Sequence, residues 1–256
     1  MGDVLFKVKH NRLLRLLLKP MMEISFKVKE IIYLKSGYPE KISQYKDMYK
    51  GKRCFVIGNG PSLRPEDLDL IRNEISFAAN RIYNIYEKTQ WRPTFFMGTD
   101  MDILRQEAGN IKKVNPLVMF LNYDASKYFG FNNPNINYLY LKGPFELIRN
   151  KFVQRGVSRD VSKYATKTQT VTCVSIELAM YMGFEKIYLL GVDHNFSKYV
   201  DSYGKMVEDK TVQNYFLGMK GGDSQAILYV DDTTACYKMV NKCAKDRGIR
   251  IYNATR

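Results

Sequence analysis

The sequence predicts an α/β fold, in which a mainly parallel sheet carries helices on both faces. Short apolar segments recur along residues 51–256 without the strict alternation that marks a sheet with one face in water. Helical patterns separate these segments, and one segment runs directly into a glycine turn and a helix start. The expected strands are 53–57, 75–79, 94–98, 117–122, 136–141, 187–192 and 249–252. The expected helices are 65–72, 81–89, 171–182 and 232–247, which together give a Rossmann-like arrangement.

The composition is that of a globular and strongly basic protein. Of its 256 residues 45% are hydrophobic and 13% aromatic, and the formal net charge is +14. This excess favours an anionic partner such as nucleic acid, an acidic membrane surface or a phosphorylated substrate. The four cysteines form no CxxC pair, and they show no metal-ligand spacing with His10 and His194. Because there is also no run of about 18 apolar residues, we expect a reduced, cytoplasmic protein.

Residues 1–50 predict a basic, amphipathic helical extension. Its first apolar helical segment is expected to stop at Pro20, and a second to run from Met21 to Leu34. Residues 1–35 hold eight Lys and Arg residues against three acids, and they lack the uncharged core and cleavage site of a signal peptide. We expect the extension to hold the protein peripherally on the anionic inner face of the plasma membrane. The alternative is packing on its own domain, or on another subunit of a homo-oligomer.

Residues 51–256 are expected to form one domain with its ligand site at the carboxyl ends of the strands, as in other open parallel sheets. Residues 197–230, rich in Gly, Tyr and Lys, show little periodicity and predict a lid-like loop region. Polar clusters follow four expected strands, at 58–62, 80–81, 98–102 and 193–195.

The most informative of these clusters is Gly58-Asn59-Gly60-Pro61-Ser62. A strand, a glycine turn and a helix start together allow backbone N–H groups to approach a phosphate or a ribose. The pattern is not the dinucleotide fingerprint, because Leu63 stands where the third glycine belongs, and it is not a P-loop. The alternative is a tight turn that needs glycine for its backbone conformation alone.

Three segments together resemble a known group of enzymes. They are Gly58 to Leu63, Asn80 to Tyr83, and Met182 to Asp193, which ends in Gly191-Val192-Asp193. They are similar to the bacterial sialyltransferases of glycosyltransferase family 42. They are at least as similar to the related DUF115, or MptE-like, proteins, which include flagellin nonulosonate-transferase-like proteins and archaeal 6-hydroxymethylpterin diphosphokinases. The resemblance covers roughly residues 51–256, and relatives usually continue beyond the point where this chain ends, as expected of a truncated chain.

The resemblance implies a site for a CMP-linked sugar. In the sialyltransferases a Gly-Asn-Gly loop, an asparagine after a later strand and a turn before the long helix line this site. Carried over by position, the implied nucleotide-binding residues are Gly58, Asn59, Gly60, Pro61, Ser62, Asn80, Arg81, Thr170 and Thr172. Family tyrosines that follow the Gly-x-Asp motif bind the donor phosphate and help the nucleotide to leave. The candidates for that role here are Tyr199 and Tyr203.

The catalytic base is where this chain departs from the sialyltransferases. They use a histidine at a set distance before the tyrosine of the last strand, and the same distance from Tyr252 leads to Asp231. Either this carboxylate acts as the base, or His194 acts from a different strand end, or no such base is needed. Asp193 is expected to orient His194 or the loop backbone. Because of this departure, the donor sugar need not be sialic acid itself.

Asp100-Met101-Asp102 spells D-x-D, a carboxylate pair that binds a divalent ion in many glycosyltransferases. The family 42 enzymes need no metal, whereas the diphosphokinases need Mg²⁺. The alternative is that Asp100 binds the ribose or the acceptor and that Asp102 caps a helix.

Taken together, the sequence predicts a glycosyltransferase of bacterial surface polysaccharide synthesis. It would move a sugar from a nucleotide donor, with a CMP-linked, sialic-acid-like donor favoured, to a glycan or glycolipid acceptor. No cofactor is expected to be required, with Mg²⁺ kept as an option, and no nucleic acid partner is expected. The alternatives are an ATP- and Mg²⁺-dependent 6-hydroxymethylpterin-type diphosphokinase and a non-catalytic, membrane-associated binding protein.

Overall fold

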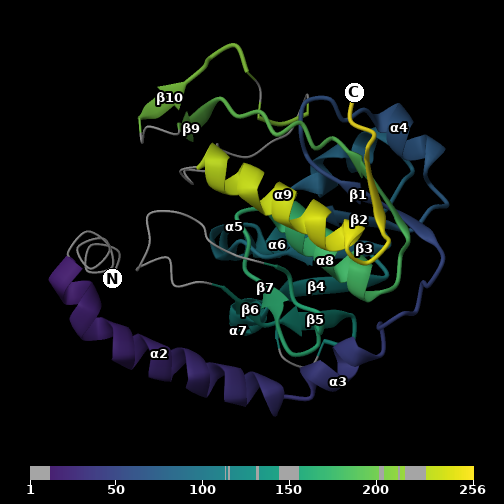
Figure 1. The fold of residues 1–256 in the computed structure, drawn as a ribbon. Coiled ribbons are helices and arrows are strands. Elements are labelled where there is room, and N and C mark those ends of the chain that lie inside the picture. The colour runs from purple at the N-terminus through teal and green to yellow at the C-terminus, as the bar shows by residue number, and fades with distance from the viewer. Residues whose placement is uncertain are drawn as a thin grey trace.

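A seven-stranded parallel sheet forms the centre of the molecule (Figure 1). The computed structural model describes residues 12–112, 114, 116–130, 133–143, 156–201, 205–212, 214–216 and 229–256. The strands lie in the order β11-β8-β1-β2-β3-β4-β5, and each pairs with its neighbours in parallel. They are β1 (Arg53–Ile57), β2 (Ser76–Ala79), β3 (Phe95–Gly98), β4 (Val118–Asn122), β5 (Ile136–Leu139), β8 (Lys186–Leu190) and β11 (Arg250–Asn253). The predicted α/β, Rossmann-like fold is confirmed.

The strand order puts a switch point between β1 and β8. From β1 the chain steps outward through β2, β3 and β4 to β5, and then returns to place β8 on the other side of β1. In a parallel sheet the connections on the two sides of such a point run to opposite faces, so a crevice opens at the carboxyl ends of the two strands. Gly58 and Gly191 directly follow these two ends.

Helices cover both faces, because successive strand residues point to opposite sides of the sheet. Val56 and Phe77 pack in one hydrophobic cluster, whereas Ile57 and Ala78, their neighbours in the chain, pack in the other. The first cluster includes residues of α3 (Tyr38–Ser43), α8 (Val171–Tyr181) and α9 (Val230–Lys245). The second includes residues of α4 (Pro65–Leu70), α5 (Met101–Gln106), α6 (Ala108–Ile111), α7 (Ser126–Phe129) and the 3₁₀ segments η1 (Ile82–Lys88) and η2 (Tyr123–Ala125).

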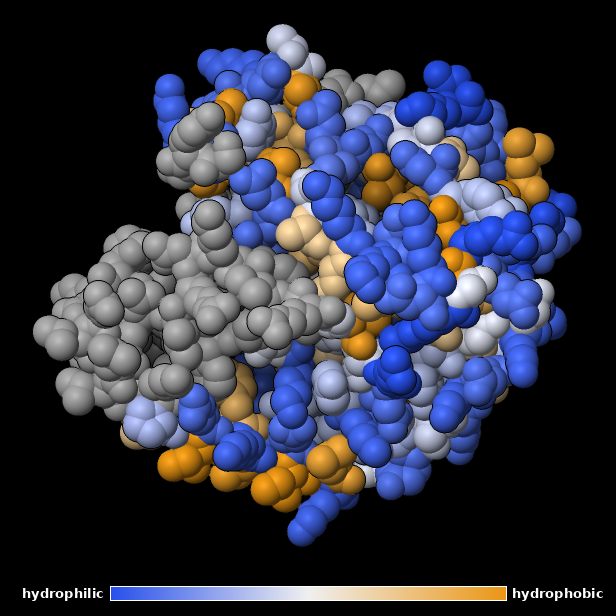
Figure 2. Space-filling model, viewed as in Figure 1, coloured by the Kyte–Doolittle hydropathy of each residue, from blue (hydrophilic) through white to orange (hydrophobic). Residues whose placement is uncertain are grey.

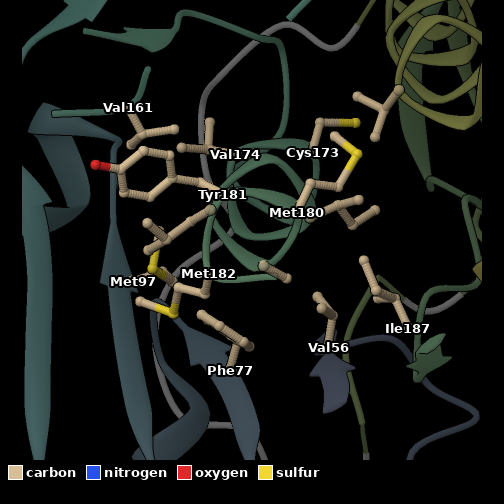
Figure 3. Close-up of a cluster of buried hydrophobic side chains, with 14 of the residues drawn as sticks. Val56, Phe77, Met97, Val161, Cys173, Val174, Met180, Tyr181, Met182 and Ile187 are labelled. Carbon is tan, nitrogen blue, oxygen red and sulfur yellow. The ribbon is translucent and has the colours of Figure 1, made fainter. Parts of the chain in front are cut away.

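Helix α8 is buried on all sides. Every residue from Thr172 to Tyr181 is buried, because the helix lies between the sheet and α9. Figure 3 shows α8 end-on, with Val174 and Tyr181 beside Val161 on one side and with Val56 and Phe77 of the strands on the opposite side. Such a helix needs mostly apolar residues on every side, which α8 provides, with Thr172, Ser175 and Glu177 as its buried polar residues.

Helix α2 (Arg12–Leu34) runs along the outside of the domain at the lower edge of Figure 1. Tyr33 Oη donates to the Ser162 carbonyl at 3.0 Å, and Tyr140 Oη donates to the Phe26 carbonyl at 3.2 Å. Pro20 lies within α2, so the predicted stop at this residue is wrong. A proline removes one amide donor and crowds the preceding turn, but a helix can continue through it. No helix in the described parts of the chain is long and apolar enough to cross a membrane.

The remaining differences from the expected elements are local. The expected helix 81–89 is the 3₁₀ segment η1, and the expected strand 136–141 is divided into β5 and β6 (Leu141–Lys142), which pairs with β7 (Ala165–Thr166). The described part of the lid-like region 197–230 contains a hairpin of β9 (Lys198–Val200) and β10 (Met206–Glu208). The domain boundary at residue 50 stays a prediction, although Ile42 packs in the same core as the sheet.

Glu177 of α8 fastens the segment before α8 to the helix. Its carboxylate is fully buried and accepts from the Ser158 amide at 2.8 Å, the Thr166 amide at 3.0 Å and the Thr166 hydroxyl at 2.9 Å. The Thr166 amide also lies 3.1 Å from Oε1, so three of the four contacts meet at that atom. Burial raises the pKa of Glu177 to about 7, against the opposing effect of these donors.

We expect Glu177→Ala to lower the free energy of unfolding by about 3 kcal/mol, because two buried amides lose their carboxylate acceptor. Glu177→Gln keeps Oε1 and should cost much less. Between pH 4.5 and about 7 the folded wild type holds more protons than the unfolded chain, so its stability falls as pH rises through this interval. The Gln variant should lack this component. Urea denaturation at several pH values measures both effects.

The matched control is Glu185→Ala, since Glu185 is exposed at the start of the next strand. We expect this change to stay within about 0.5 kcal/mol of the wild type. An Ala variant at 177 that is as stable as this control would contradict the role given to Glu177.

Candidate functional site

A cavity of about 580 Å³ opens at the carboxyl ends of the parallel strands. It lies where β1, β2, β3 and β8 end and where α8 begins. A volume of this size suits a nucleotide or a similar small molecule. The cavity brings together nine of the residues selected from the sequence, namely Gly58, Asn59, Gly60, Asn80, Asp100, Thr170, Thr172, Asp193 and His194.

The glycine loop packs directly against the end of β8. Gly58 N donates to the Leu190 carbonyl at 2.8 Å, and Gly60 N donates to the Gly191 carbonyl at 2.9 Å. A Cβ at Gly58 would lie 2.2 Å from the Gly191 oxygen. The glycines are therefore required by this backbone contact. Their amides are already bonded within the protein, so the expected approach of these two N–H groups to a phosphate is not what the structure shows.

The two asparagines after β1 and β2 supply polar atoms to the cavity. Asn59 Nδ2 donates to the Ala79 carbonyl at 3.0 Å, which ties the two strand ends together. Its Oδ1 is buried and has no hydrogen-bond partner in the described structure. Asn80 has a φ of 56°, a left-handed conformation that costs free energy in residues other than glycine. Both features carry a free-energy cost, and a ligand would reach Asn59 Oδ1 only after a local shift of its neighbours.

Asp193 holds the glycine loop through Ser62. Ser62 Oγ donates to Asp193 Oδ2 at 2.8 Å, and a Cβ at Gly60 would collide with that carboxylate. The expected orienting role of Asp193 is therefore directed at the loop. Pro61 and Ser62 stand behind the cavity wall rather than in it.

His194 combines three unusual features. Its φ is 52°, its Nε2 lies 2.8 Å from Thr234 Oγ1, and its Nδ1 is buried without a partner in the described structure. The ring meets Phe196 and Tyr237 edge-on. Burial lowers the pKa of His194 from its ordinary value of 6.5, so the ring is neutral near pH 7. When Nε2 carries the proton and donates to Thr234, Nδ1 is left as a proton acceptor.

The N-terminus of α8 faces the same cavity. Thr170 is the N-cap, and its Oγ1 accepts from Thr172 N at 3.3 Å. Lys167, Thr168 and Gln169, which precede it, also line the cavity. The partial positive charge of a helix N-terminus, with a lysine and several hydroxyls around it, favours an anion such as a phosphate.

The D-x-D residues do not act as a pair. Asp100 Oδ1 caps α5 by accepting from Asp102 N at 2.8 Å and Ile103 N at 3.2 Å. Asp102 is 79% exposed and pairs with Arg105 at 3.1 Å, away from the cavity. Asp100, rather than Asp102, is therefore the helix cap. Within the described ranges no three His, Cys, Asp or Glu side chains gather as metal ligands, and these residues do not fit a preformed Mg²⁺ site.

Arg81, Asp231 and Tyr199 are not among the residues that line the cavity. Arg81 is buried and pairs with Glu107 at 2.9 Å, which fixes the start of η1. Asp231 is exposed in the first turn of α9. Tyr199 lies in β9, and Tyr203 lies outside the described residues. Their predicted roles stay predictions.

Several cavity residues were not selected from the sequence. Phe26 and Lys29 of α2 line the cavity, and Lys29 pairs with Asp124, which also lines it. Nothing in the local spacing of α2 indicates this, because the contact joins residues almost a hundred positions apart. Asn122, in contrast, ends an expected strand, and the strand-end rule selects it as readily as Asn80. Tyr237 of α9 completes this group.

We expect Gly58→Ala to lower the free energy of unfolding by about 2 kcal/mol or more, since the new Cβ meets a backbone oxygen that cannot move aside. Gly109→Ala is the matched control. Gly109 is exposed in α6 with no atom within 4 Å of an added Cβ, and alanine favours a helix, so a gain of up to about 1 kcal/mol is expected. Equal effects of the two changes in chemical denaturation would show that the β1–β8 contact is not tight.

A family model agrees with the motif resemblance. The model described as 6-hydroxymethylpterin diphosphokinase MptE-like matches residues 29–199, which is more than half of the chain. None of the curated proteins compared with the chain matches it.

Two solved structures are similar to this chain over most of its length. The MAf glycosyltransferase from Magnetospirillum magneticum AMB-1 is 14% identical with a TM-score of 0.45, and the match covers 85% of this chain and 36% of that one. The sialyltransferase CstII from Campylobacter jejuni, in complex with cytidine-5'-monophosphate, is 15% identical with a TM-score of 0.47, and the match covers 80% of this chain and 81% of that one. This chain thus spans about a third of the length of the Magnetospirillum protein.

Proposed function

The chain belongs to the MptE-like family, and we propose that it is a glycosyltransferase that uses a nucleotide-linked sugar as donor. The favoured donor is a CMP-linked, sialic-acid-like sugar, as the motif resemblance to family 42 implies. The acceptor is a glycan or glycolipid of bacterial surface polysaccharide synthesis. We place the enzyme on the cytoplasmic side of the membrane.

The observation that carries this proposal is the polarity of the cavity. On one side the strand ends supply Asn59 and the strained Asn80, which suit the hydrogen-bonding edge of a nucleoside once a local shift exposes Asn59 Oδ1. On the other side the N-terminus of α8, with Lys167 and Thr170, suits a phosphate. A ligand with a neutral polar end and an anionic end matches both sides at once, as a nucleotide does.

His194 is the proposed base for sugar transfer. As the acceptor oxygen bonds to the anomeric carbon, the bond from that carbon to the phosphate oxygen breaks, and Nδ1 takes the hydroxyl proton. The nucleotide leaves with the electron pair on its phosphate, near Thr170 and Thr172. Tyr199 of β9 would steady this leaving group, and the motif resemblance gives Tyr203 the same role. Because Nδ1 is buried, the role requires the ring or its neighbours to shift when the acceptor binds.

No resident metal is part of this proposal. The cavity carboxylates of Asp100, Asp124 and Asp193 already have protein partners, namely α5 amides, Lys29 and Ser62. The phosphate charge would instead meet the α8 N-terminus and Lys167.

The family description favours one other activity, the transfer of diphosphate from ATP to a pterin-like alcohol. That reaction places a triphosphate in the cavity, whose charge Mg²⁺ commonly neutralises. Asp100 would be the ligand for it, since Asp102 points away.

Thermal unfolding with CMP, UDP, GDP or ATP, each with and without Mg²⁺, separates these activities. We expect CMP to stabilise the protein with or without metal, by about 2.7 kcal/mol, or several degrees, at a concentration near 100 times its Kd. Stabilisation by ATP that requires Mg²⁺ would instead support the diphosphokinase. No stabilisation by any nucleotide would support a non-catalytic protein.

Two asparagine variants serve as a matched pair for this test. Asn59→Ala removes the buried, unpaired Oδ1 and should abolish most of the CMP shift. Asn135→Ala, an exposed residue before β5, should leave the shift unchanged. Equal CMP shifts in both variants would remove Asn59 from the nucleotide site.

We expect His194→Gln to slow the release of CMP from CMP-N-acetylneuraminate by about 100-fold or more, with CMP binding retained. In the wild type the rate should fall as pH drops through the lowered pKa of His194, below 6.5, because only the neutral ring accepts a proton.

Asp231→Asn provides the comparison, because Asp231 is exposed and outside the cavity wall. Its rate should stay close to that of the wild type. Loss of activity in Asp231→Asn together with a near-normal His194→Gln rate would reverse the assignment of the base.

A further inference from the structure

Helix α2 has an apolar face that nothing in the described structure covers. Met21, Ile24, Val28, Ile31 and Ile32 are each between 50% and 63% exposed. Four of them, at 21, 24, 28 and 31, are separated by three, four and three positions, which places them on one side of the helix. We call these five residues the outer stripe. Figure 2 shows apolar side chains gathered along the lower edge, where α2 runs in Figure 1.

The outer stripe does not pack against the domain, because a different side of α2 makes that contact. Tyr33 is fully buried and bonds to the Ser162 carbonyl, and Glu30 pairs with Lys142 at 2.7 Å. Phe26 and Lys29 face the cavity. By helical spacing these residues lie across the helix from Ile24 and Val28.

Scattered exposed apolar residues are ordinary on protein surfaces, but a continuous group of them is not. Elsewhere in the described structure the large exposed apolar residues stand apart from one another in sequence, as Leu70 and Leu117 do. On α2 the five residues of the outer stripe fall within 12 positions, from Met21 to Ile32. This density indicates a binding surface.

The charges beside the outer stripe select its partner. Lys27 flanks it and is exposed, and Lys35 follows at its end, whereas Glu23 and Glu30 lie toward the domain side. A second copy of α2 packed on the same stripe would bring the same lysines and no acid to meet them. Arg12, Arg15 and Lys19 make the earlier part of α2 basic as well, but by helical spacing they share the side of Glu23 and Phe26, so Lys27 and Lys35 are the cations beside the stripe. An apolar face with basic residues around it matches a membrane surface of anionic lipid.

We propose that the outer stripe of α2 inserts into an anionic lipid surface, with the helix lying in the plane of that surface. The opposite side of the same helix contributes Phe26 and Lys29 to the cavity. The surface would therefore lie one helix diameter from the cavity wall, about 10 Å. This inference does not depend on which reaction the cavity performs.

Vesicle flotation tests the proposal with the whole chain. The protein should float with phosphatidylglycerol-containing phosphatidylcholine vesicles and much less with pure phosphatidylcholine. The variant Met21→Gln/Ile24→Gln/Val28→Gln/Ile31→Gln should bind at least about tenfold more weakly. Glutamine is a good helix former, so α2 itself should be retained, and circular dichroism checks this.

The matched control is Leu70→Gln/Leu117→Gln, which removes exposed apolar residues outside α2 and should bind as the wild type does. Unchanged vesicle binding by the four-residue variant would overturn the proposal. The proposal would also be overturned if the wild type does not bind vesicles but forms a dimer in sedimentation equilibrium, and if the four-residue variant does not form that dimer. In that case the outer stripe would be a contact between copies of this chain.

Discussion

The close approach of the β1 and β8 ends is the contact on which the site depends. Gly58 and Gly60 donate to the carbonyls of Leu190 and Gly191, so the two loops that leave the sheet here run against each other. This happens at the switch point of the strand order, where a parallel sheet otherwise opens. The contact turns an open crevice into a walled cavity. It also fixes the backbone from which Asn59 extends in one loop and, three residues after Gly191, His194 extends in the other.

Several residues around the cavity have features that cost free energy of folding, and the rest of the fold offsets this cost. Asn80 and His194 have left-handed backbones, and Asn59 Oδ1 and His194 Nδ1 are buried without partners. Each such feature costs on the order of 1–3 kcal/mol. The compensation lies behind the cavity, in α8, whose full burial between the sheet and α9 supplies a large apolar contact. Features of this kind are typical of places where a protein keeps a shape for its ligand.

The sequence predicts the sheet well because each strand is a short apolar segment that ends in a polar turn. The ends of β1, β2 and β8, and so most of the cavity, follow from that pattern. The hydrogen-bond partners of the loop amides could not be predicted. The sequence Gly58-Asn59-Gly60 is compatible both with N–H groups that bind a ligand and with N–H groups that donate to a neighbouring carbonyl. The contribution of Phe26 and Lys29 was also missed, because the pairing of Lys29 with Asp124 depends on tertiary packing. The low helix propensity of proline predicted a helix end at Pro20. This was wrong, because a helix can continue when one backbone N–H donor is missing.

The engagement of the glycine amides separates two kinds of change that this loop can undergo in evolution. The backbone of Gly58 and Gly60 is fixed by its contact with Gly191, whatever the cavity binds. The side chain of Asn59 extends from that fixed backbone, and exchanging it removes its bond to the Ala79 carbonyl but leaves the contact between β1 and β8 in place. Proteins that share this fold can therefore come to bind different ligands through substitutions at Asn59. Glycine at 58 and 60 is required by the contact between β1 and β8, whichever ligand binds.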